Sequence, residues 1–334
     1  MKVLITGGAG YIGSHLVDHF LSEGAVVTAI DNLSSGYRRN IQHNLGSPRF
    51  RFVEGDVLDR RLMEQLIRGH DLVCHLAAVV GVRRVLADPL QVILQNVGGT
   101  ELVLALAHKH SCRVLFASTS EVYGKNRRVP FAEDDDRVLG STRIARWVYS
   151  TTKALDEHLC FAYYARGLQV SIVRYFNSYG PRLDAKGYGS VVATFIMQAM
   201  ANTPLTIHHD GRQTRCFTYI DDTVRGSVLA ATKPEALGQV FNIGSDVETT
   251  ILELAELILR LTKSDAGLTF IPYHEAYGAD FEDTPRRVPD VSKAAQVLGF
   301  RAEVPLQEGL QKTIAWFRDC QACRNGDEEW TDAN

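Results

Sequence analysis

Lys2-Val-Leu-Ile-Thr-Gly-Gly-Ala-Gly-Tyr-Ile-Gly13 is the stretch that sets the fold of this chain. Its first part, residues 2–6, is a short run of β-branched and leucine side chains, typical of a strand buried on both faces in a parallel sheet. Glycines follow at once, and residues 14–22 then repeat apolar side chains with the period of a helix. A strand, a glycine turn and a helix in this order predict a loop that holds phosphate groups at the helix N-terminus.

The glycines and one carboxylate indicate that the ligand of this loop is a dinucleotide. Gly8 and Gly10 permit a tight turn and a close approach of the backbone to a pyrophosphate, and Gly13 lets the helix pack closely on the strand. A second expected strand, residues 25–30, ends at Asp31, about twenty residues beyond the loop, where an acidic side chain binds the adenosine ribose. Because a 2'-phosphate would meet that carboxylate, the sequence predicts NAD rather than NADP.

Strands and helices alternate through residue 176, which predicts an α/β fold with a doubly wound parallel sheet of the Rossmann type. Further strands are expected at 51–56, 72–76, 114–117 and 170–174, and helices at 62–67, 92–110 and 149–166. The polar segment 126–142 is expected to be a solvated loop rather than a metal site. We therefore place an NAD-binding domain at residues 1–178.

After residue 180 the pattern changes, and we expect a smaller α/β substrate domain over residues 179–320, with some segments returning to the first domain. Helices are expected at 190–200, 221–232, 249–261, 291–298 and 306–318. Short strands at 204–208 and 216–220 flank Asp210-Gly211, which predicts a hairpin turn. Residues 321–334 are an acidic tail that we expect to fray.

The composition is that of an ordinary soluble globular protein, with 334 residues, 45% hydrophobic side chains and a formal net charge of -3. No basic patch dominates, so nucleic acid is not expected as a partner. No apolar run approaches the roughly eighteen residues of a membrane span, and because a strand pattern begins at Lys2 we expect no signal peptide. Six cysteines, mostly within apolar runs, are interpreted as reduced, which favours the cytoplasm. No metal site is expected, because Cys320-x2-Cys323 has no further ligands nearby.

Two short segments carry the residue types needed for chemistry on a hydroxyl group. Tyr149 and Lys153 are four residues apart, so on a helix both side chains lie on one face. A nearby ammonium lowers the pKa of a tyrosine, which can then take a proton from a substrate hydroxyl while hydride leaves the same carbon. The expected strand 114–117 delivers Ser118-Thr-Ser-Glu121 to the carboxyl edge of the sheet, where ligands bind in open α/β folds.

These motifs occur together in one family. Gly7-x2-Gly10-x2-Gly13, Tyr149-x3-Lys153 and the run from Ser118 to Gly124 resemble the extended short-chain dehydrogenase/reductase family. The resemblance covers about residues 1–318. It implies NAD as cofactor, a nucleoside-diphosphate sugar bound by the second domain, and a homodimer.

Within this family, Thr119-Ser-Glu-Val-Tyr-Gly124 resembles UDP-glucuronate decarboxylases, as do the segments that begin at Arg146 and Arg286. Gly81-Val-Arg83 is more similar to UDP-glucuronate 4-epimerases, and Val288 stands where decarboxylases usually carry lysine. The resemblance therefore implies a UDP-glucuronate decarboxylase that yields UDP-xylose or a UDP-4-keto-pentose. The alternative is a C4 epimerase of UDP-glucose, UDP-galactose or UDP-glucuronate. A third hypothesis, a non-catalytic NAD-binding protein, predicts a broken Tyr-Lys pair, and the pair is intact.

The resemblance also implies roles for individual residues. Catalytic roles are expected for Thr119, Ser120, Glu121, Tyr149, Lys153 and Arg287. NAD is expected to contact Gly7, Gly10, Tyr11, Ile12, Gly13, Asp31, Asn32, Asp56, Val57, Leu76, Ala77, Ala78, Asn96, Tyr149 and Lys153. The UDP-sugar is expected to contact Arg83, Asn177, Arg182, Arg215 and Arg287.

For a decarboxylase these roles combine into one reaction. Tyr149 removes the C4 hydroxyl proton as hydride leaves C4, and Thr119 hydrogen-bonds the C4 oxygen. The ketone formed at C4 is β to the carboxylate, so carbon dioxide can leave with its electrons flowing into the ketone. Glu121 and Ser120 handle protons near C5, while Arg287 orients the carboxyl group and stabilises the enolate.

Overall fold

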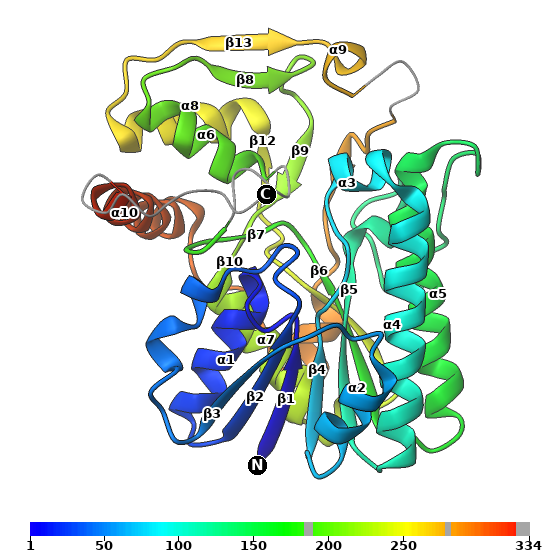
Figure 1. The fold of residues 1–334 in the computed structure, drawn as a ribbon. Coiled ribbons are helices and arrows are strands. Elements are labelled where there is room, and N and C mark those ends of the chain that lie inside the picture. The colour runs from blue at the N-terminus through cyan, green and yellow to red at the C-terminus, as the bar shows by residue number, and fades with distance from the viewer. Residues whose placement is uncertain (184–189, 278–281, 325–334) are drawn as a thin grey trace.

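The computed structural model describes residues 1–183, 190–277 and 282–324, and its centre is a seven-stranded sheet in the order β11-β6-β5-β4-β1-β2-β3 (Figure 1). Its strands are β1 (Lys2–Thr6), β2 (Val26–Asp31), β3 (Phe50–Glu54), β4 (Leu72–His75), β5 (Arg113–Thr119), β6 (Val170–Tyr175) and β11 (Val240–Ile243). Neighbouring strands are parallel throughout. The fold class predicted from the sequence is confirmed.

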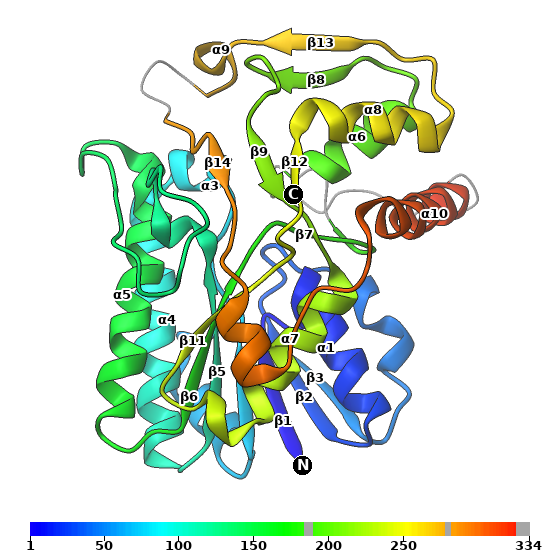
Figure 2. The same ribbon diagram turned by 180° about the vertical axis from the view of Figure 1, so that it is seen from behind.

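Helices cover both faces of this sheet (Figures 1 and 2). On one face are α1 (Tyr11–Ser22) and α7 (Ile220–Thr232), and on the other are α2 (Arg60–Ile67), α4 (Pro89–Lys109) and α5 (Val148–Tyr164). Strand β1 joins the two layers, because successive side chains of a strand point to opposite faces. Val3 and Ile5 pack into the apolar cluster with α1, whereas Leu4 between them packs with α2 and α4.

The strand order reverses at β1, which lies between β2 and β4 although β2 and β3 precede β4 in the chain. In open α/β sheets such a reversal leaves a crevice at the carboxyl ends of the strands, because the flanking connections leave in opposite directions. The glycine turn after β1 and the loop after β4 both begin at this edge. The topology therefore places the predicted site residues together.

One strand of the large sheet comes from the second half of the chain. β11 pairs in parallel with β6, and α7, also from the second half, packs against α1. β11 was not predicted, because a strand of only four residues has too short a pattern to be recognised. The domain division at residue 178 remains a prediction, since these later segments pack on the first sheet.

The smaller part of the molecule lies above the carboxyl edge of the large sheet (Figure 1). Its strands are β7 (Ser178–Tyr179), β8 (Leu205–His208), β9 (Thr214–Cys216), β10 (Thr218–Tyr219), β12 (Glu248–Thr250), β13 (Leu268–Ile271) and β14 (Arg286–Arg287). The predicted hairpin at Asp210-Gly211 is wrong. β8 pairs in parallel with β13, and β9 pairs with β12 and β14, so the chain turns there but its two strands join different sheets.

The remaining helices agree in part with the sequence pattern. They are α3 (Val82–Ala87), α6 (Val191–Met200), α8 (Ile251–Thr262), α9 (Tyr273–Tyr277), α10 (Leu306–Arg324) and a π-helix at Ala294–Leu298. Short 3-10 helices lie at Arg38–Asn40, Gln42–Asn44, Ser120–Tyr123, Ala145–Trp147 and Pro234–Ala236. α3 and α9 were not predicted. α8 begins after 249, because Thr250 caps it in a capping box with Glu253.

Helix α4 corrects the expectation that no apolar segment approaches the length of a membrane span. By length and composition it is apolar enough to cross a membrane, with half of its apolar window buried inside the protein. It packs against α5 and α2. Core helices of soluble proteins pass the same test, so this property is weak evidence for a membrane span.

Candidate active site

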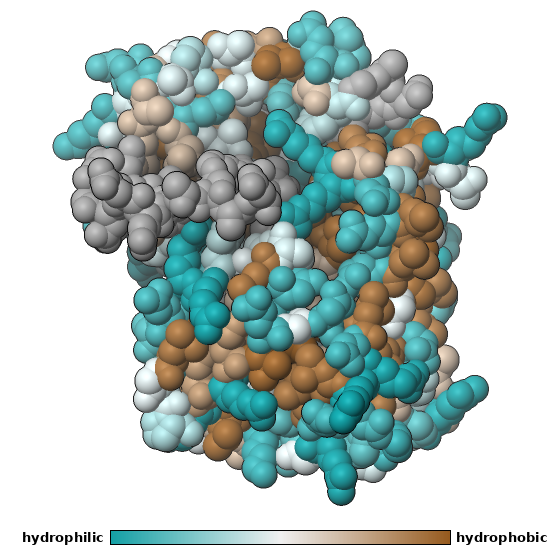
Figure 3. Space-filling model, viewed as in Figure 1, coloured by the Kyte–Doolittle hydropathy of each residue, from teal (hydrophilic) through white to brown (hydrophobic). Residues whose placement is uncertain are grey.

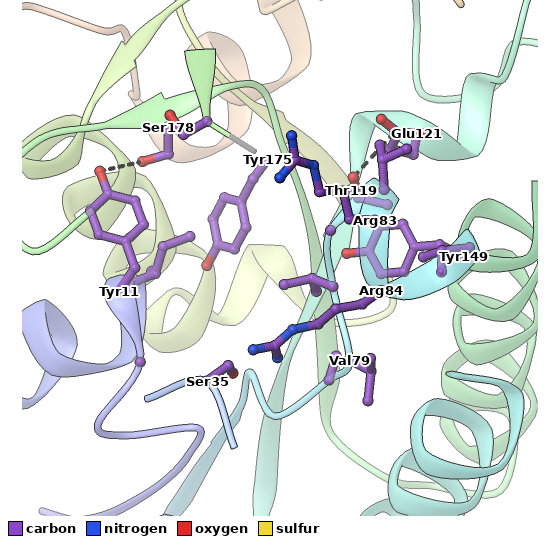
Figure 4. Close-up of a pocket in the computed structure, with 18 of the residues that line it drawn as sticks. Tyr11, Ser35, Val79, Arg83, Arg84, Thr119, Glu121, Tyr149, Tyr175 and Ser178 are labelled. Atoms are coloured by element: carbon purple, nitrogen blue, oxygen red, sulfur yellow. Dashed lines mark hydrogen bonds between the residues drawn. The ribbon is translucent and has the colours of Figure 1, made fainter. Parts of the chain in front are cut away.

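A cavity of about 1100 Å³ lies between the carboxyl edge of the large sheet and the smaller part of the molecule (Figure 4). The glycine turn, Asp31 and the loop after β4 line one half of it. Residues of α6, β8, β9 and β14 line the other half, and the ends of β5 and α5 lie between them. The cavity is therefore open to a ligand with two parts.

The glycine turn has the geometry of a phosphate cradle. Gly7 has a φ of +67°, which other residues adopt at a cost, and a Cβ on Gly13 would lie 2.1 Å from the carbonyl oxygen of Gly7. Gly10 occupies the N-cap of α1 without a side-chain cap. The first backbone N–H groups of α1 therefore point into the cavity, where they can bind a pyrophosphate.

Asp31 lies at the end of β2 with its carboxylate turned toward the same turn. One oxygen accepts a hydrogen bond from the backbone N–H of Ala9 at 3.0 Å, and the other accepts one from that of Leu33 at 2.8 Å. Burial raises the pKa of Asp31, while these hydrogen bonds lower it. The side chain is 8% exposed and lines the cavity.

We expect the protein to bind NAD at least tenfold more tightly than NADP. A 2'-phosphate would place two negative charges beside the ionised Asp31 in a partly buried site, where like charges repel strongly. Isothermal titration calorimetry with both dinucleotides at low salt measures the difference. Equal affinities would contradict the assignment of Asp31 as the discriminating residue.

Fourteen of the fifteen residues predicted to contact the cofactor line the cavity. These are Gly7, Gly10, Tyr11, Ile12, Gly13, Asp31, Asn32, Asp56, Val57, Leu76, Ala77, Ala78, Tyr149 and Lys153. The exception is Asn96, which is 1% exposed inside α4. Its side chain accepts from the N–H of Val79 at 2.7 Å and donates to the carbonyl of the same residue at 3.2 Å. Asn96 thus positions the loop that lines the cavity, but its own side chain does not line the cavity.

Tyr149 and Lys153 both project from α5 into the cavity, as their spacing predicts. The Lys153 ammonium is buried and donates to the carbonyl oxygen of Ala117 at 2.9 Å. Burial lowers the pKa of Lys153, and the nearby Asp156 opposes this. The ammonium is therefore fixed between β5 and α5.

The expected lowering of the tyrosine pKa does not occur in the free protein. Burial raises the pKa of Tyr149, and the charge of Glu121 raises it further, whereas a hydrogen bond with Thr119 lowers it. The phenol is neutral before ligands bind. A positive charge brought close to it is needed to make Tyr149 an effective base at neutral pH.

Glu121 forms ion pairs with two arginines from different parts of the chain. Arg146 lies 2.6 Å from one carboxyl oxygen, and Arg287 donates to the other at 2.8 Å. Burial alone would raise the pKa of Glu121, but the two guanidinium groups overcome it and hold that pKa well below its usual range. The 3-10 helix after β5 fixes the carboxylate beside Thr119, whose hydroxyl accepts from the Glu121 N–H (Figure 4).

Arg146 was not predicted to belong to the site. Its side chain is 5% exposed and lies in the 3-10 helix just before α5. Arg146 stands three residues before Tyr149, between the expected polar loop 126–142 and the expected helix 149–166, and nothing in this local sequence marks it as a site residue. Only the folded chain brings it onto Glu121.

The predicted substrate residues do not all reach the cavity. Arg83, Asn177, Arg215 and Arg287 line it. Arg215 donates two hydrogen bonds to Asp283, at 3.0 and 3.1 Å. Arg182 does not line the cavity, because it has a φ of +67° and its side chain pairs with Asp18 on α1 at 2.6 Å. Further lining residues that the sequence did not predict are Gln198, Thr206, His208, Gln213, Tyr273 and Tyr277.

Asp156 is a fully buried carboxylate behind the site. It lies on α5 close to Lys153, and neither of its oxygens has a well-formed hydrogen bond to a described residue. Burial raises the pKa of Asp156 to about 6, although Lys153 and the Thr100 hydroxyl lower it. An ionised carboxylate in this position destabilises the folded state.

We expect Asp156→Asn to raise the free energy of unfolding at pH 8. The folded pKa of about 6 exceeds the ordinary value of 3.8, so the wild-type protein loses stability as the pH rises from about 4 to 6 and regains none above it. That difference corresponds to about 3 kcal/mol at pH 8. Urea denaturation from pH 4 to 8 measures it, with the exposed Asp134→Asn as control. An unchanged pH dependence would contradict the prediction.

Comparison with known proteins agrees with this geometry. Residues 3–244 match the NAD dependent epimerase/dehydratase family, and the chain belongs to that family. It is therefore an NAD-dependent enzyme, and the predicted resemblance and cofactor are confirmed. The glycine cradle and Asp31 fit NAD.

Particular relatives are similar over almost the whole chain. The chain is 41% identical to UDP-N-acetyl-alpha-D-glucosaminuronate decarboxylase of Bacillus cytotoxicus, covering 96% of this chain and 98% of that one. It is 37% identical to UDP-glucuronic acid decarboxylase 1 of Danio rerio, covering 95% and 72%. A crystal structure of UDP-glucuronic acid 4-epimerase from Bacillus cereus, in complex with UDP-glucuronic acid and NAD, has a TM-score of 0.87 at 31% identity and covers 96% of this chain and all of that one.

Proposed function

We propose that this enzyme decarboxylates a UDP-hexuronic acid through a 4-keto intermediate. The observation that carries the proposal is the pairing of Glu121 with both Arg146 and Arg287 in the cavity. With the neighbouring pair Arg215–Asp283, the described residues of this buried cluster contribute three guanidinium groups and two carboxylates, which leaves one positive charge in excess. An anionic group of the substrate would balance it, because a buried unpaired charge is costly. The carboxylate at C6 of a uronate is such a group, whereas neutral hexoses have none.

The residues of the chain divide the chemistry between them. Tyr149 takes the proton of the C4 hydroxyl, and Thr119, which hydrogen-bonds the phenol, is placed to contact the same oxygen. Bound NAD supplies the hydride acceptor and, in its oxidised form, a positive charge that favours the phenolate. Lys153 remains hydrogen-bonded to the Ala117 carbonyl. Once C4 is a ketone, the C5–C6 bond can break and carbon dioxide leaves.

Substrate binding changes the protonation behaviour of Glu121. In the free protein this carboxylate is ionised and can only accept a proton. When Arg287 turns to the C6 carboxylate, Arg146 alone holds down the pKa of Glu121, which therefore rises. Glu121 can then take up a proton from solvent and donate it to C5 after carbon dioxide has left, with the neighbouring Ser120 as a hydroxyl relay.

The test is a product analysis with UDP-glucuronate carrying carbon-13 at C6. We expect labelled carbon dioxide and a UDP-pentose or UDP-4-keto-pentose in the NMR spectrum. UDP-N-acetylglucosaminuronate forms a second arm, because the two decarboxylase relatives differ in whether C2 carries a hydroxyl or an N-acetyl group. UDP-glucose and UDP-galactose are the neutral controls.

A C4 epimerase is the second candidate. The similarity to the UDP-glucuronic acid 4-epimerase fold and the segment Gly81–Arg83 favour it. An epimerase would retain the labelled carbon in the sugar and accumulate the C4 epimer. That outcome, without carbon dioxide, would replace the first proposal by the second.

We further propose that the protein is a cytoplasmic homodimer whose subunits meet through α4 and α5. Leu90 and Leu94 on α4 are 63% and 61% exposed, and Leu155 and Phe161 on α5 are also exposed. Figure 3 shows apolar side chains gathered along α4. Two adjacent helices with apolar outer faces suit a symmetric interface. Sedimentation velocity gives the mass in solution, and a monomer at micromolar concentration would contradict this proposal.

A further inference from the structure

Helix α3 carries two neighbouring arginines that point into different halves of the cavity. Figure 4 shows Arg84 extended toward Ser35 in the cofactor half, while Arg83 points away from it toward the substrate half. The charge of Arg83 acts on His208 and Tyr277, which come from the smaller part of the molecule. The two side chains therefore lie toward different halves of the cavity.

Arg84 bridges two walls of the cofactor half. Its guanidinium donates to the backbone carbonyl of Ser34, in the loop after β2, at 3.0 Å. Ser34 and Ser35 follow Asp31 and line the cavity, as does Arg84 itself. The contact joins residues fifty positions apart in the sequence across the opening of the dinucleotide cleft.

A cation beside the dinucleotide would balance negative charges in the cofactor half of the cavity. Its described lining includes the carboxylates Asp31 and Asp56, and the glycine turn offers only neutral N–H groups. The pyrophosphate of a dinucleotide brings two more negative charges. Of the described lining residues in this half, Arg84 and Lys153 are the cations, and Lys153 is already fixed on Ala117. A guanidinium has five donors, so it can bind the Ser34 carbonyl and phosphate oxygens together.

We propose that Arg84 is a cofactor-binding residue that holds the dinucleotide in its cleft by contacting the pyrophosphate while it ties α3 to the loop after β2. Loss of this side chain should weaken the hold on both oxidised and reduced cofactor. The inference needs only the NAD binding of the family. Its consequence for the products rests on the proposed function.

The time at which the reduced cofactor leaves the protein decides which sugar product is formed. When the cofactor stays bound, the hydride taken from C4 returns to C4 after the C5–C6 bond has broken, and the products are a UDP-pentose and carbon dioxide. When the reduced cofactor leaves first, the 4-keto pentose is released, and one NAD is consumed for each carbon dioxide. Arg84 would thus favour the UDP-pentose over the keto sugar.

The first experiment measures release of NADH from the full-length protein by stopped-flow fluorescence without any sugar nucleotide. We expect Arg84→Ala to release NADH at least tenfold faster and to purify with less bound cofactor, with Arg84→Lys in between because it keeps the charge but loses the planar donors. Arg83→Ala, on the same helix, should release NADH at the wild-type rate. Wild-type release from Arg84→Ala would overturn the proposal, as would equally fast release from Arg83→Ala, which would implicate α3 as a whole.

The second experiment measures the ratio of keto pentose to pentose formed from UDP-glucuronate. We expect this ratio to rise in Arg84→Ala. If the wild-type protein forms no carbon dioxide, the proposed function fails while the NADH result still decides the role of Arg84. Thermal unfolding of each variant confirms that it is folded, and Arg84→Lys provides the answer if Arg84→Ala does not fold.

Discussion

Replacement of Tyr149 by phenylalanine is expected to lower turnover of the UDP-sugar about a thousandfold, which corresponds to about 4 kcal/mol of barrier. The change removes only the phenolic oxygen, which is the group that takes the C4 proton. Thr119 and Lys153 keep their places, since Lys153 is held by the Ala117 carbonyl rather than by the phenol. Affinity for NADH and thermal stability should stay close to those of the wild type.

The matched control is Tyr175→Phe. Tyr175 also lines the cavity, but its hydroxyl is hydrogen-bonded to Ser227 at 2.7 Å on the other side of the site (Figure 4). This variant should retain most of the activity. Near-wild-type turnover by Tyr149→Phe, with intact Tyr175→Phe, would remove Tyr149 from the role of base.

The second large effect is expected for Arg287→Ala. This change should lower kcat/KM for a UDP-uronate by two to three orders of magnitude, or about 3–4 kcal/mol. Arg287 is 7% exposed and donates to Glu121, so its loss removes the cation for the C6 carboxylate and leaves Glu121 with Arg146 alone. Binding of UDP, which has no sugar, should change little. Initial rates and calorimetry with UDP separate the two effects.

The neighbouring Arg286 provides the control. It lies on the same short strand, but it is exposed and pairs with Glu248 at 2.7 Å, so Arg286→Ala should leave turnover almost unchanged. The pH profile gives an independent check. In Arg287→Ala the pKa of Glu121 rises because one guanidinium is gone, so the limb of the pH–rate profile that reports Glu121 should move to a higher pH. An Arg287→Ala enzyme with wild-type kcat/KM for uronates would contradict the decarboxylase proposal.

The sequence predicted those parts of the site whose residues lie close together in the chain. The glycine turn and Asp31 follow one another along a strand-turn-helix unit, and Tyr149 and Lys153 are related by one turn of a helix. The pair Glu121–Arg287 spans 166 residues, and only the family resemblance brought both into view. Arg146 was missed, because nothing in its local sequence shows that it packs on Glu121.

Two expectations from the sequence differ from the arrangement in the fold for the same physical reason. The residues flanking Asp210-Gly211 favour strands and a turn, but a short strand pairs with whichever partner lies beside it, and β8 finds β13 more than sixty residues later. Arg182 has the charge expected of a phosphate ligand, yet the positive φ of its backbone directs it to Asp18. Strand pairing and side-chain direction depend on the assembled fold, so local patterns do not determine them.

The large sheet is complete only when β11, from the second half of the chain, pairs with β6. A fragment that ended at residue 178 would leave β6 as an edge strand, with its backbone N–H and C=O groups unpaired along the side that β11 now occupies. It would also expose the apolar surface beneath α7. Unpaired edges of this kind promote aggregation. We therefore expect that residues 1–178 do not fold as an autonomous module, and that the two halves fold and unfold as one cooperative unit.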